Sequence, residues 1–277
     1  MGRLLTTALL CGLAAGACTA AGAQTAPAAI PAAIKEGGLK VAIVPNYPPL
    51  DFKDPASGEL TGFDVELGNA IGAKLGVKVV WQETRFDQMM PAIATGRVDA
   101  IMSGMTDYKS RQDTATFVDY LRSGPQFFIQ KSREGEIKAM TDLCGKKVGA
   151  SRRTNFPKEI AAWSDANCGG RAIEFVGTEG SADARTQLKQ GRIDAAVQGS
   201  ETLPYVIGQE PGAFLAIGKA FAFQYTGIAL PVKETELQRA VAGALDALIA
   251  DGTYKAILDK WQLTDNAVEK ALVNAGQ

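Results

Sequence analysis

The chain has 277 residues, which is long for one compact core and sufficient for two lobes. Its 46% hydrophobic and 21% charged residues are ordinary for a globular protein, and 29 Lys and Arg against 30 Asp and Glu leave no positive excess for binding nucleic acid. The sequence contains no histidine, which excludes Ser–His and Cys–His catalysis and removes the commonest metal ligand, so we expect neither a metal nor another cofactor.

The N-terminal segment has the organisation of an export signal. A short basic head is followed by an apolar run over residues 4–17 and by a small-residue cleavage pattern at residues 21–23. The apolar run is too short to span a bilayer. We therefore expect residues 1–23 to be a removed signal peptide, residues 24–37 to be a flexible leader, and the protein to be periplasmic. The alternative is a lipid anchor at Cys18 on the outer face of a membrane.

Predicted strands and helices alternate in the first half of the mature chain. The apolar run at residues 39–44 predicts a buried strand, which Pro45 ends. A helix is predicted to open at residues 62–67 and to end at Gly76. A strand at residues 77–81 and a helix at 86–94 follow.

An internal repeat indicates a second unit of the same construction. Residues 96–104 resemble residues 191–199, and each copy runs from a helix end through a buried strand into a loop of small residues. Asp99 and Asp194 precede the strands in the two copies, and we expect them to serve structure. Because open parallel sheets bind ligands outside the carboxyl ends of their strands, the loops after the strands should line one cleft between two α/β lobes.

Two cysteines remain beyond the leader, Cys144 and Cys168. An even pair in an oxidising compartment predicts a structural disulfide, in preference to a metal site or a catalytic thiol. Closing a loop of roughly 25 residues should stabilise the fold by about 3 kcal/mol.

Several short motifs occur in order along the chain. Gly62-Phe63-Asp64-Val65-Glu66-Leu67 is the most specific, and Ser103-Gly104-Met105-Thr106 is followed shortly by Arg111. Asp251-Gly252-Thr253-Tyr254 and then Lys260-Trp261 occur near the end. From about residue 39 to 263, the chain resembles the amino-acid-type family (family 3) of bacterial extracellular solute-binding proteins, the receptor components of ABC importers.

The resemblance implies an α/β architecture, the two-lobed periplasmic-binding-protein-like fold of type II, with two parallel-rich sheets joined by a two-strand hinge. The first lobe is expected to comprise residues 38–124 and 224–277. The second lobe, residues 125–223, is inserted between them, with chain crossings near residues 123–125 and 222–226.

The resemblance also implies a set of ligand contacts. Arg111 is the principal one, because a guanidinium holds a carboxylate through two parallel charge-assisted hydrogen bonds, here the α-carboxylate of the ligand. Thr106 adds a hydroxyl, and the backbone amides of Gly104 and Thr106 are expected donors. Tyr47 and Phe86 are the expected aromatic walls. The full set, with Thr154 and Asn155 as donors from the second lobe, is Tyr47, Phe86, Ser103, Gly104, Thr106, Arg111, Thr154, Asn155 and Gly199.

The sequence departs from the family pattern at Gly199, where members that bind α-amino acids usually have an aspartate for the ligand ammonium. Glu201 or Asp51 replaces it, or the ligand has no free α-ammonium, because an unpaired buried ammonium is costly. Asp64 and Glu66 lie where a helix starts, so we expect them to cap it and to pair with its dipole.

The charges near the expected site bear on the ligand. Val44 stands where binders of basic amino acids have an acidic group, which argues against lysine, arginine or histidine. Arg111, Arg152 and Arg153 favour a neutral or acidic ligand, although the last two either add charge to the pocket or face water.

The resemblance implies a monomeric receptor that captures a small polar ligand, an amino acid or a close relative, by hinge closure and delivers it to a membrane-embedded ABC permease. The alternative is an enzyme on the same scaffold, of the cyclohexadienyl-dehydratase type, which needs a general acid or base in the cleft. A third hypothesis, a sensor ectodomain, requires a separate membrane-bound partner.

Overall fold

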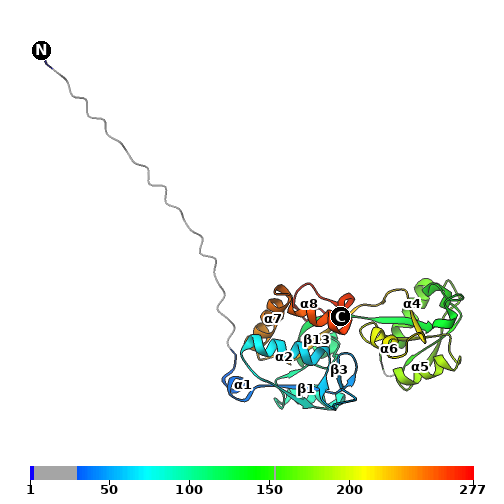
Figure 1. The fold of residues 1–277 in the computed structure, drawn as a ribbon, viewed down its shortest axis with the longest axis horizontal. Coiled ribbons are helices and arrows are strands. Elements are labelled where there is room, and N and C mark those ends of the chain that lie inside the picture. Colours follow the sequence, from blue (N-terminus) through cyan, green and yellow to red (C-terminus); the bar gives the residue numbers. More distant parts are fainter. Residues whose placement is uncertain (3–29, 153) are drawn as a thin grey trace.

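The computed structural model describes residues 1–2, 30–152 and 154–277. The signal peptide, the alternative anchor at Cys18 and Arg153 lie outside the described residues, apart from Met1 and Gly2. The fold consists of two lobes joined side by side, and the C-terminus lies in the first lobe close to the junction (Figure 1). In residues 30–152 and 154–277, no helix combines the length and the apolar composition that crossing a membrane requires.

A six-stranded mixed sheet forms the centre of the first lobe. Its parallel part is built on β1, which pairs with β5 on one side and β6 on the other, while β13, β7 and β14 continue the sheet antiparallel. The order is β14 (Leu272–Val273), β7 (Ala115–Ser123), β13 (Gln224–Pro231), β6 (Ala100–Ile101), β1 (Leu39–Ile43) and β5 (Val79–Glu83). A small sheet lies beside it, formed by β2 (Asn46–Tyr47), β3 (Asp51–Lys53) and β4 (Leu60–Thr61).

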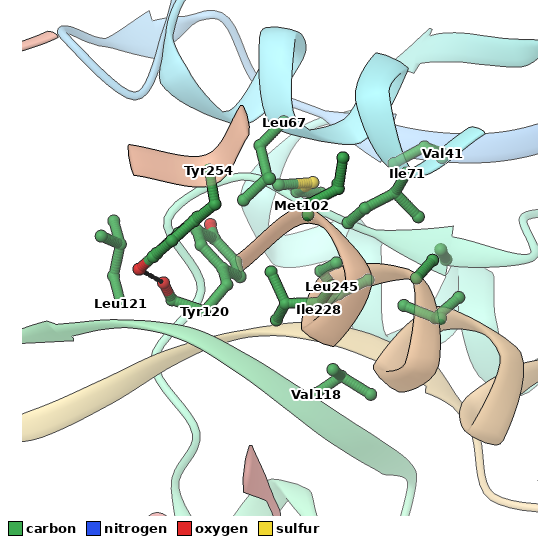
Figure 2. Packing of buried hydrophobic residues seen from close by; sticks show 14 of the residues in the cluster. Val41, Leu67, Ile71, Met102, Val118, Tyr120, Leu121, Ile228, Leu245 and Tyr254 are labelled. Carbon is green, nitrogen blue, oxygen red and sulfur yellow. Dashed lines mark hydrogen bonds between the residues drawn. The ribbon is translucent and has the colours of Figure 1, made fainter. Parts of the chain in front are cut away.

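Helices cover this sheet and bury its core. Figure 2 shows Leu67 and Ile71 of one helix and Leu245 of another packed against Val118 and Ile228 of the strands. The Tyr254 hydroxyl donates to the Tyr120 carbonyl at 2.7 Å, which satisfies a polar group inside this core. The helices are α1 (Ala32–Gly37), α2 (Phe63–Leu75), α3 (Phe86–Ala94), α7 (Thr235–Ala250) and α8 (Thr253–Trp261).

Two of these helices bear on the sequence predictions. The helix predicted at residues 86–94 is confirmed as α3, and the predicted stop at Gly76 is confirmed because Gly76 adopts the left-handed conformation after α2. Residues 32–37, predicted to be part of a flexible leader, instead form α1. Ile34 is the physical reason, since its side chain is 5% exposed and packs into the core of the first lobe.

The second lobe has its own five-stranded sheet and separate hydrophobic clusters. The strand β9 pairs parallel with β10 and β11, and β8 pairs antiparallel with β11 and β12. The order is β10 (Glu174–Thr178), β9 (Lys147–Ser151), β11 (Ala195–Gly199), β8 (Pro125–Gln130) and β12 (Phe214–Ile217). Its helices are α4 (Phe156–Asn167), α5 (Ser181–Lys189) and α6 (Leu203–Gln209), and its short 3₁₀ helices are η2 (Lys131–Arg133) and η3 (Met140–Leu143). The first lobe contains the 3₁₀ helices η1 (Lys109–Arg111) and η4 (Thr264–Asn266).

The predicted disulfide between Cys144 and Cys168 is confirmed, with 5.3 Å between the Cα atoms. It joins the residue after η3 to the C-terminal end of α4. The loop that it closes lies within the second lobe.

The repeat predicted from the sequence has a structural counterpart in its two aspartates. Asp99 accepts the backbone amide of Lys40 at 2.8 Å, and Asp194 accepts that of Lys147 at 2.8 Å. In both cases the carboxylate holds the start of the neighbouring parallel strand, β1 or β9. The prediction of a structural role is confirmed.

The chain passes between the sheets at two adjacent places. Gly124 separates β7 from β8, and residues 218–223 lead from β12 to β13. The two segments touch, because the Phe221 amide donates to the Pro125 carbonyl at 2.9 Å. A Cβ atom at Gly124 would lie 2.7 Å from the Phe221 carbonyl oxygen, so only glycine fits.

Candidate ligand-binding site

A cavity of about 380 Å³ lies between the lobes, beyond the carboxyl ends of the strands. Every residue of the predicted contact set lines it except Gly199. The first lobe contributes Val44, Asn46, Tyr47, Phe86, Ser103, Gly104, Thr106, Tyr108 and Arg111; the second contributes Thr154, Asn155, Phe156 and Glu201; the crossings contribute Ser123, Gly124, Gln224 and Thr226.

Arg111 presents a cation to this cavity from the end of η1. One of its guanidinium nitrogens, Nη1, donates to the Thr106 carbonyl at 2.7 Å, and its central carbon lies 5.8 Å from the Phe86 ring centroid and 5.0 Å from that of Tyr108. None of the ion pairs between described residues includes Arg111. Burial lowers the pKa of the guanidinium, opposed by Tyr108 and Asp107. The side chain is therefore held in place with donors free for an anion.

The backbone amide of Gly104 does not have the role predicted for it. Its amide donates to Asp64 Oδ2 at 2.8 Å, so this amide is not the free ligand donor that the sequence suggests. Its φ is +55°, and a Cβ atom there would lie 2.9 Å from the Tyr47 ring. Glycine is thus required because the aromatic wall packs directly on the backbone.

Asp64 lies in the first turn of α2, as predicted, but it does not cap the helix. It is fully buried in the first turn of α2 and makes no capping bond, because its oxygens accept from the Gly104 amide and, at 2.8 Å, from the Tyr120 hydroxyl. Burial raises its pKa to about 6. Asp64 connects α2 and β7 to the loop that carries the site. Glu66 pairs instead with Lys260 of α8.

Asp51, one of the two candidates for the missing aspartate, lies behind the cavity wall. It is fully buried, is not part of the cavity wall, and accepts the Ser103 hydroxyl at 2.9 Å. Ser103 in turn accepts the Val44 amide at 3.0 Å, so its hydroxyl joins two strand ends. Burial, with Asp64 nearby, raises the pKa of Asp51 to about 9, which leaves it neutral at pH 7.

The Glu201 carboxyl lies directly beside Gly199, the residue at which the resemblance leads us to expect an aspartate. Gly199 ends β11 outside the cavity wall, and a Cβ atom added to it would lie 2.6 Å from the carboxyl carbon of Glu201. Gly199, predicted to contact the ligand, therefore does not line the cavity, because the Glu201 carboxyl fills the volume beside it. Glu201 is 4% exposed, and its two oxygens accept the hydroxyls of Tyr47 and Ser123. Burial raises its pKa, opposed by the bonds from Ser123 and Tyr47.

The second lobe contributes the start of α4. The Thr154 hydroxyl donates to the Ser151 carbonyl at 2.9 Å and accepts the Phe156 amide at 3.2 Å, while Asn155 is exposed beside it. Arg152 turns away from the cavity wall and pairs with Glu179 at 3.0 Å. Of the two alternatives for Arg152, the structure supports the solvent-facing one.

The residues that sequence reasoning missed lie mainly at the crossings. Gln224 accepts the Tyr108 hydroxyl at 3.0 Å and donates to Glu159 of α4, so it connects both lobes. Ser123 lies in the other crossing. These residues could have been predicted from the expected crossings at residues 123–125 and 222–226, because a chain that passes between two lobes borders the gap between them.

The comparisons with known proteins agree with this architecture. The sequence pattern of the bacterial extracellular solute-binding proteins, family 3, matches residues 39–264. The chain belongs to this family. It is 32% identical to the L-arginine-binding protein of Pseudomonas aeruginosa over 237 residues, which cover 80% of this chain and 87% of that protein. It is 31% identical to the L-cystine-binding protein TcyJ of Escherichia coli, over 82% of this chain and 84% of that one.

Solved structures are similar at the level of the whole fold. The ancestral cationic amino acid solute-binding protein AncCDT-1 superposes with a TM-score of 0.71 at 30% identity, covering 82% of this chain and 97% of that one. A second structure of AncCDT-1, described as a precursor of cyclohexadienyl dehydratase, gives 0.65 at 30% identity over 83% and 96% of the two chains. The predicted type II periplasmic-binding-protein-like fold is confirmed.

Proposed function

We propose that this family 3 protein is an extracytoplasmic receptor that captures an amino acid or a close relative between its lobes and delivers it to an ABC permease. The observation that carries the proposal is the guanidinium of Arg111, which has no ion-pair partner among the described residues and faces an interlobe cavity beside Phe86 and Tyr108. Such a fork binds a ligand carboxylate. The relatives named for arginine and cystine support an amino acid as the class of ligand.

Capture proceeds by hinge closure in this proposal. The ligand first meets Arg111 and the rings of Tyr47 and Phe86 on the larger lobe. The second lobe then approaches with Thr154 and Asn155 at the start of α4. The closed state is favoured only by the free energy of these added contacts. We further propose that the receptor works as a monomer in the periplasm.

The composition of the cavity wall favours a ligand whose side chain is uncharged. Arg111 and Glu201 are its only Asp, Glu, Lys or Arg residues among those described, and the wall also contains Val44 at the end of β1. If the two charged groups pair with the α-groups of an amino acid, the rest of the ligand meets neutral side chains. The relatives named for arginine and histidine make a basic side chain the alternative to test.

The experiment is identification of the small molecule that copurifies, by mass spectrometry of the denatured protein, followed by calorimetry. The calorimetric panel contains basic, neutral and acidic amino acids, and the expected result is one-to-one binding of at least one of them. Micromolar affinity requires about 8 kcal/mol, which a bidentate ion pair, aromatic contacts and several hydrogen bonds supply. Absence of binding across the panel, with no copurifying amino acid, would refute the proposal.

The properties of Glu201 make an enzyme on the same scaffold the alternative function to test. A buried carboxyl with a raised pKa in a ligand cavity has the properties of a general acid, and one structural neighbour is described as a precursor of cyclohexadienyl dehydratase. Each bound compound is therefore recovered after incubation and analysed by NMR. Unchanged compound supports the receptor, and turnover that Glu201→Gln abolishes supports the enzyme.

A further inference from the structure

The cavity presents a guanidinium and a carboxyl group that are not paired with each other. Arg111 and Glu201 both line it, yet no ion pair joins them, and Glu201 has no cationic partner among the described residues. A carboxylate that is 4% exposed pays a large desolvation cost unless a cation compensates it. The cavity is thus bordered by Arg111, which can bind an anion, and by Glu201, which can bind a cation.

The Glu201 carboxyl retains the capacity to accept further hydrogen bonds. Each of its oxygens accepts one hydroxyl, from Tyr47 or from Ser123. A carboxylate has about four lone-pair sites, so roughly two remain for an ammonium group. The two hydroxyls also fix the carboxyl from the first lobe and from the crossing strand, which limits the entropy that binding must remove.

The local backbone explains why the carboxyl comes from position 201. Gly199 has no side chain, and the space beside its Cα atom is filled by the carboxyl group of Glu201. A side chain at 199 and the present position of Glu201 exclude each other. Asp51 does not compete for the role, because it is buried behind Ser103 and neutral at pH 7.

Resting on the receptor function proposed above, we infer that Glu201 accepts the ligand ammonium in place of the aspartate missing at Gly199. The ligand is then a zwitterion, with its carboxylate on Arg111 and its ammonium on Glu201. Its side chain lies against the neutral remainder of the wall. This excludes the alternative, raised by Gly199, of a ligand without a free α-ammonium.

The test compares amino acids with analogues that lack only the amino group. The pairs are L-glutamine with 4-carbamoylbutanoate, L-phenylalanine with 3-phenylpropanoate, and L-arginine with 5-guanidinopentanoate. By calorimetry, wild-type protein should bind at least one amino acid with an affinity about 30-fold or more above that for its analogue. This factor is the lower end of the affinity loss expected when a buried charge pair loses one partner. Glu201→Gln, which keeps the shape of the side chain, should reduce that preference to within about threefold.

A relocated carboxylate supplies the matched control. Glu201→Ala should lose the preference, and Gly199→Asp combined with Glu201→Ala should restore it, because removal of the Glu201 carboxyl frees the space that a side chain at 199 needs. A merely structural role of Glu201 would not be rescued in this way. Thermal unfolding of each variant confirms that it is folded.

The outcomes separate this inference from the receptor function. Retention of the preference in Glu201→Gln overturns the inference, as does wild-type protein that binds an analogue as tightly as its amino acid. Both results leave the receptor proposal standing. If no amino acid of the calorimetric panel binds wild-type protein and none copurifies, the receptor proposal fails and the inference that rests on it fails with it.

Discussion

The strongest quantitative expectation concerns Arg111→Ala. Among the described residues, the Arg111 guanidinium donates a hydrogen bond to the Thr106 carbonyl, and its remaining donors are available in the cavity. Two charge-assisted bonds at about 1.5–3 kcal/mol each would give about 3–6 kcal/mol, and partial exposure reduces this. We therefore expect a loss of about 2–5 kcal/mol, roughly 30- to 5,000-fold in affinity. The variant Arg111→Lys keeps the charge without the forked guanidinium, so its affinity should lie between those of wild-type protein and Arg111→Ala.

The assay is calorimetric titration of the bound amino acid into wild-type and variant protein, with thermal unfolding to check the fold. Stability should change little, because Arg111 is only partly buried and its bond to Thr106 borders the cavity. Arg152→Ala is the matched control: this arginine lies near the cleft but pairs with Glu179 outside the cavity wall, so its removal should change affinity by less than about 0.5 kcal/mol. Equal affinities of wild-type protein and Arg111→Ala would remove Arg111 from the site.

Three further expectations follow. The double variant Cys144→Ser and Cys168→Ser should lose about 3 kcal/mol of unfolding free energy in urea, because the bridge closes a loop with a sequence separation of 24 residues; equal urea midpoints would contradict this. The raised pKa of Asp51, about 9, means that the folded chain holds a proton that the unfolded chain loses near pH 4. Wild-type stability should therefore fall relative to Asp51→Asn by up to about 1.4 kcal/mol per pH unit as pH rises towards 9, whereas parallel urea-derived profiles would refute the assignment. Phe86→Ala should weaken ligand binding by about 1–2 kcal/mol in calorimetry while the melting temperature stays close to wild type, since Phe86 is 46% exposed. A large fall in melting temperature would show that Phe86 is a core residue instead.

Much of the site could be predicted from the sequence because strand ends are visible in it. Apolar runs that stop at small residues or proline locate the tips of β1, β6 and β9, and the cavity lies beyond those tips. Tyr47 and Thr154 both follow such strand ends, and the resemblance gave them their roles as ligand contacts. Arg111 required the resemblance, since an arginine in a charged stretch carries no signal of its own.

The sequence could not show how the polar groups pair. The Gly104 amide donates to Asp64, which lies 40 residues earlier in the chain, and the Ser103 hydroxyl donates to Asp51. Such pairings depend on which loops meet in three dimensions. Glu201 shows the same limit, because only coordinates reveal that its carboxyl fills the space beside Gly199.

The way the lobes are joined explains how modest binding energy can move them. Each lobe has its own hydrophobic clusters, and none of the ion pairs between described residues joins the two lobes. The side-chain contacts between the lobes include those of Glu201 with Tyr47 and of Gln224 with Glu159, at or beside the cavity wall. Away from this cavity, Asn266 donates to the Ser200 hydroxyl at 3.0 Å and the rings of Phe52 and Tyr205 lie 5.7 Å apart. Reorienting the lobes thus leaves the hydrophobic cluster of each lobe intact, and part of what it changes is polar contact at the ligand cavity. A ligand that pairs with both Arg111 and Glu201 would favour one orientation by an amount comparable to its own contacts, as hinge closure requires.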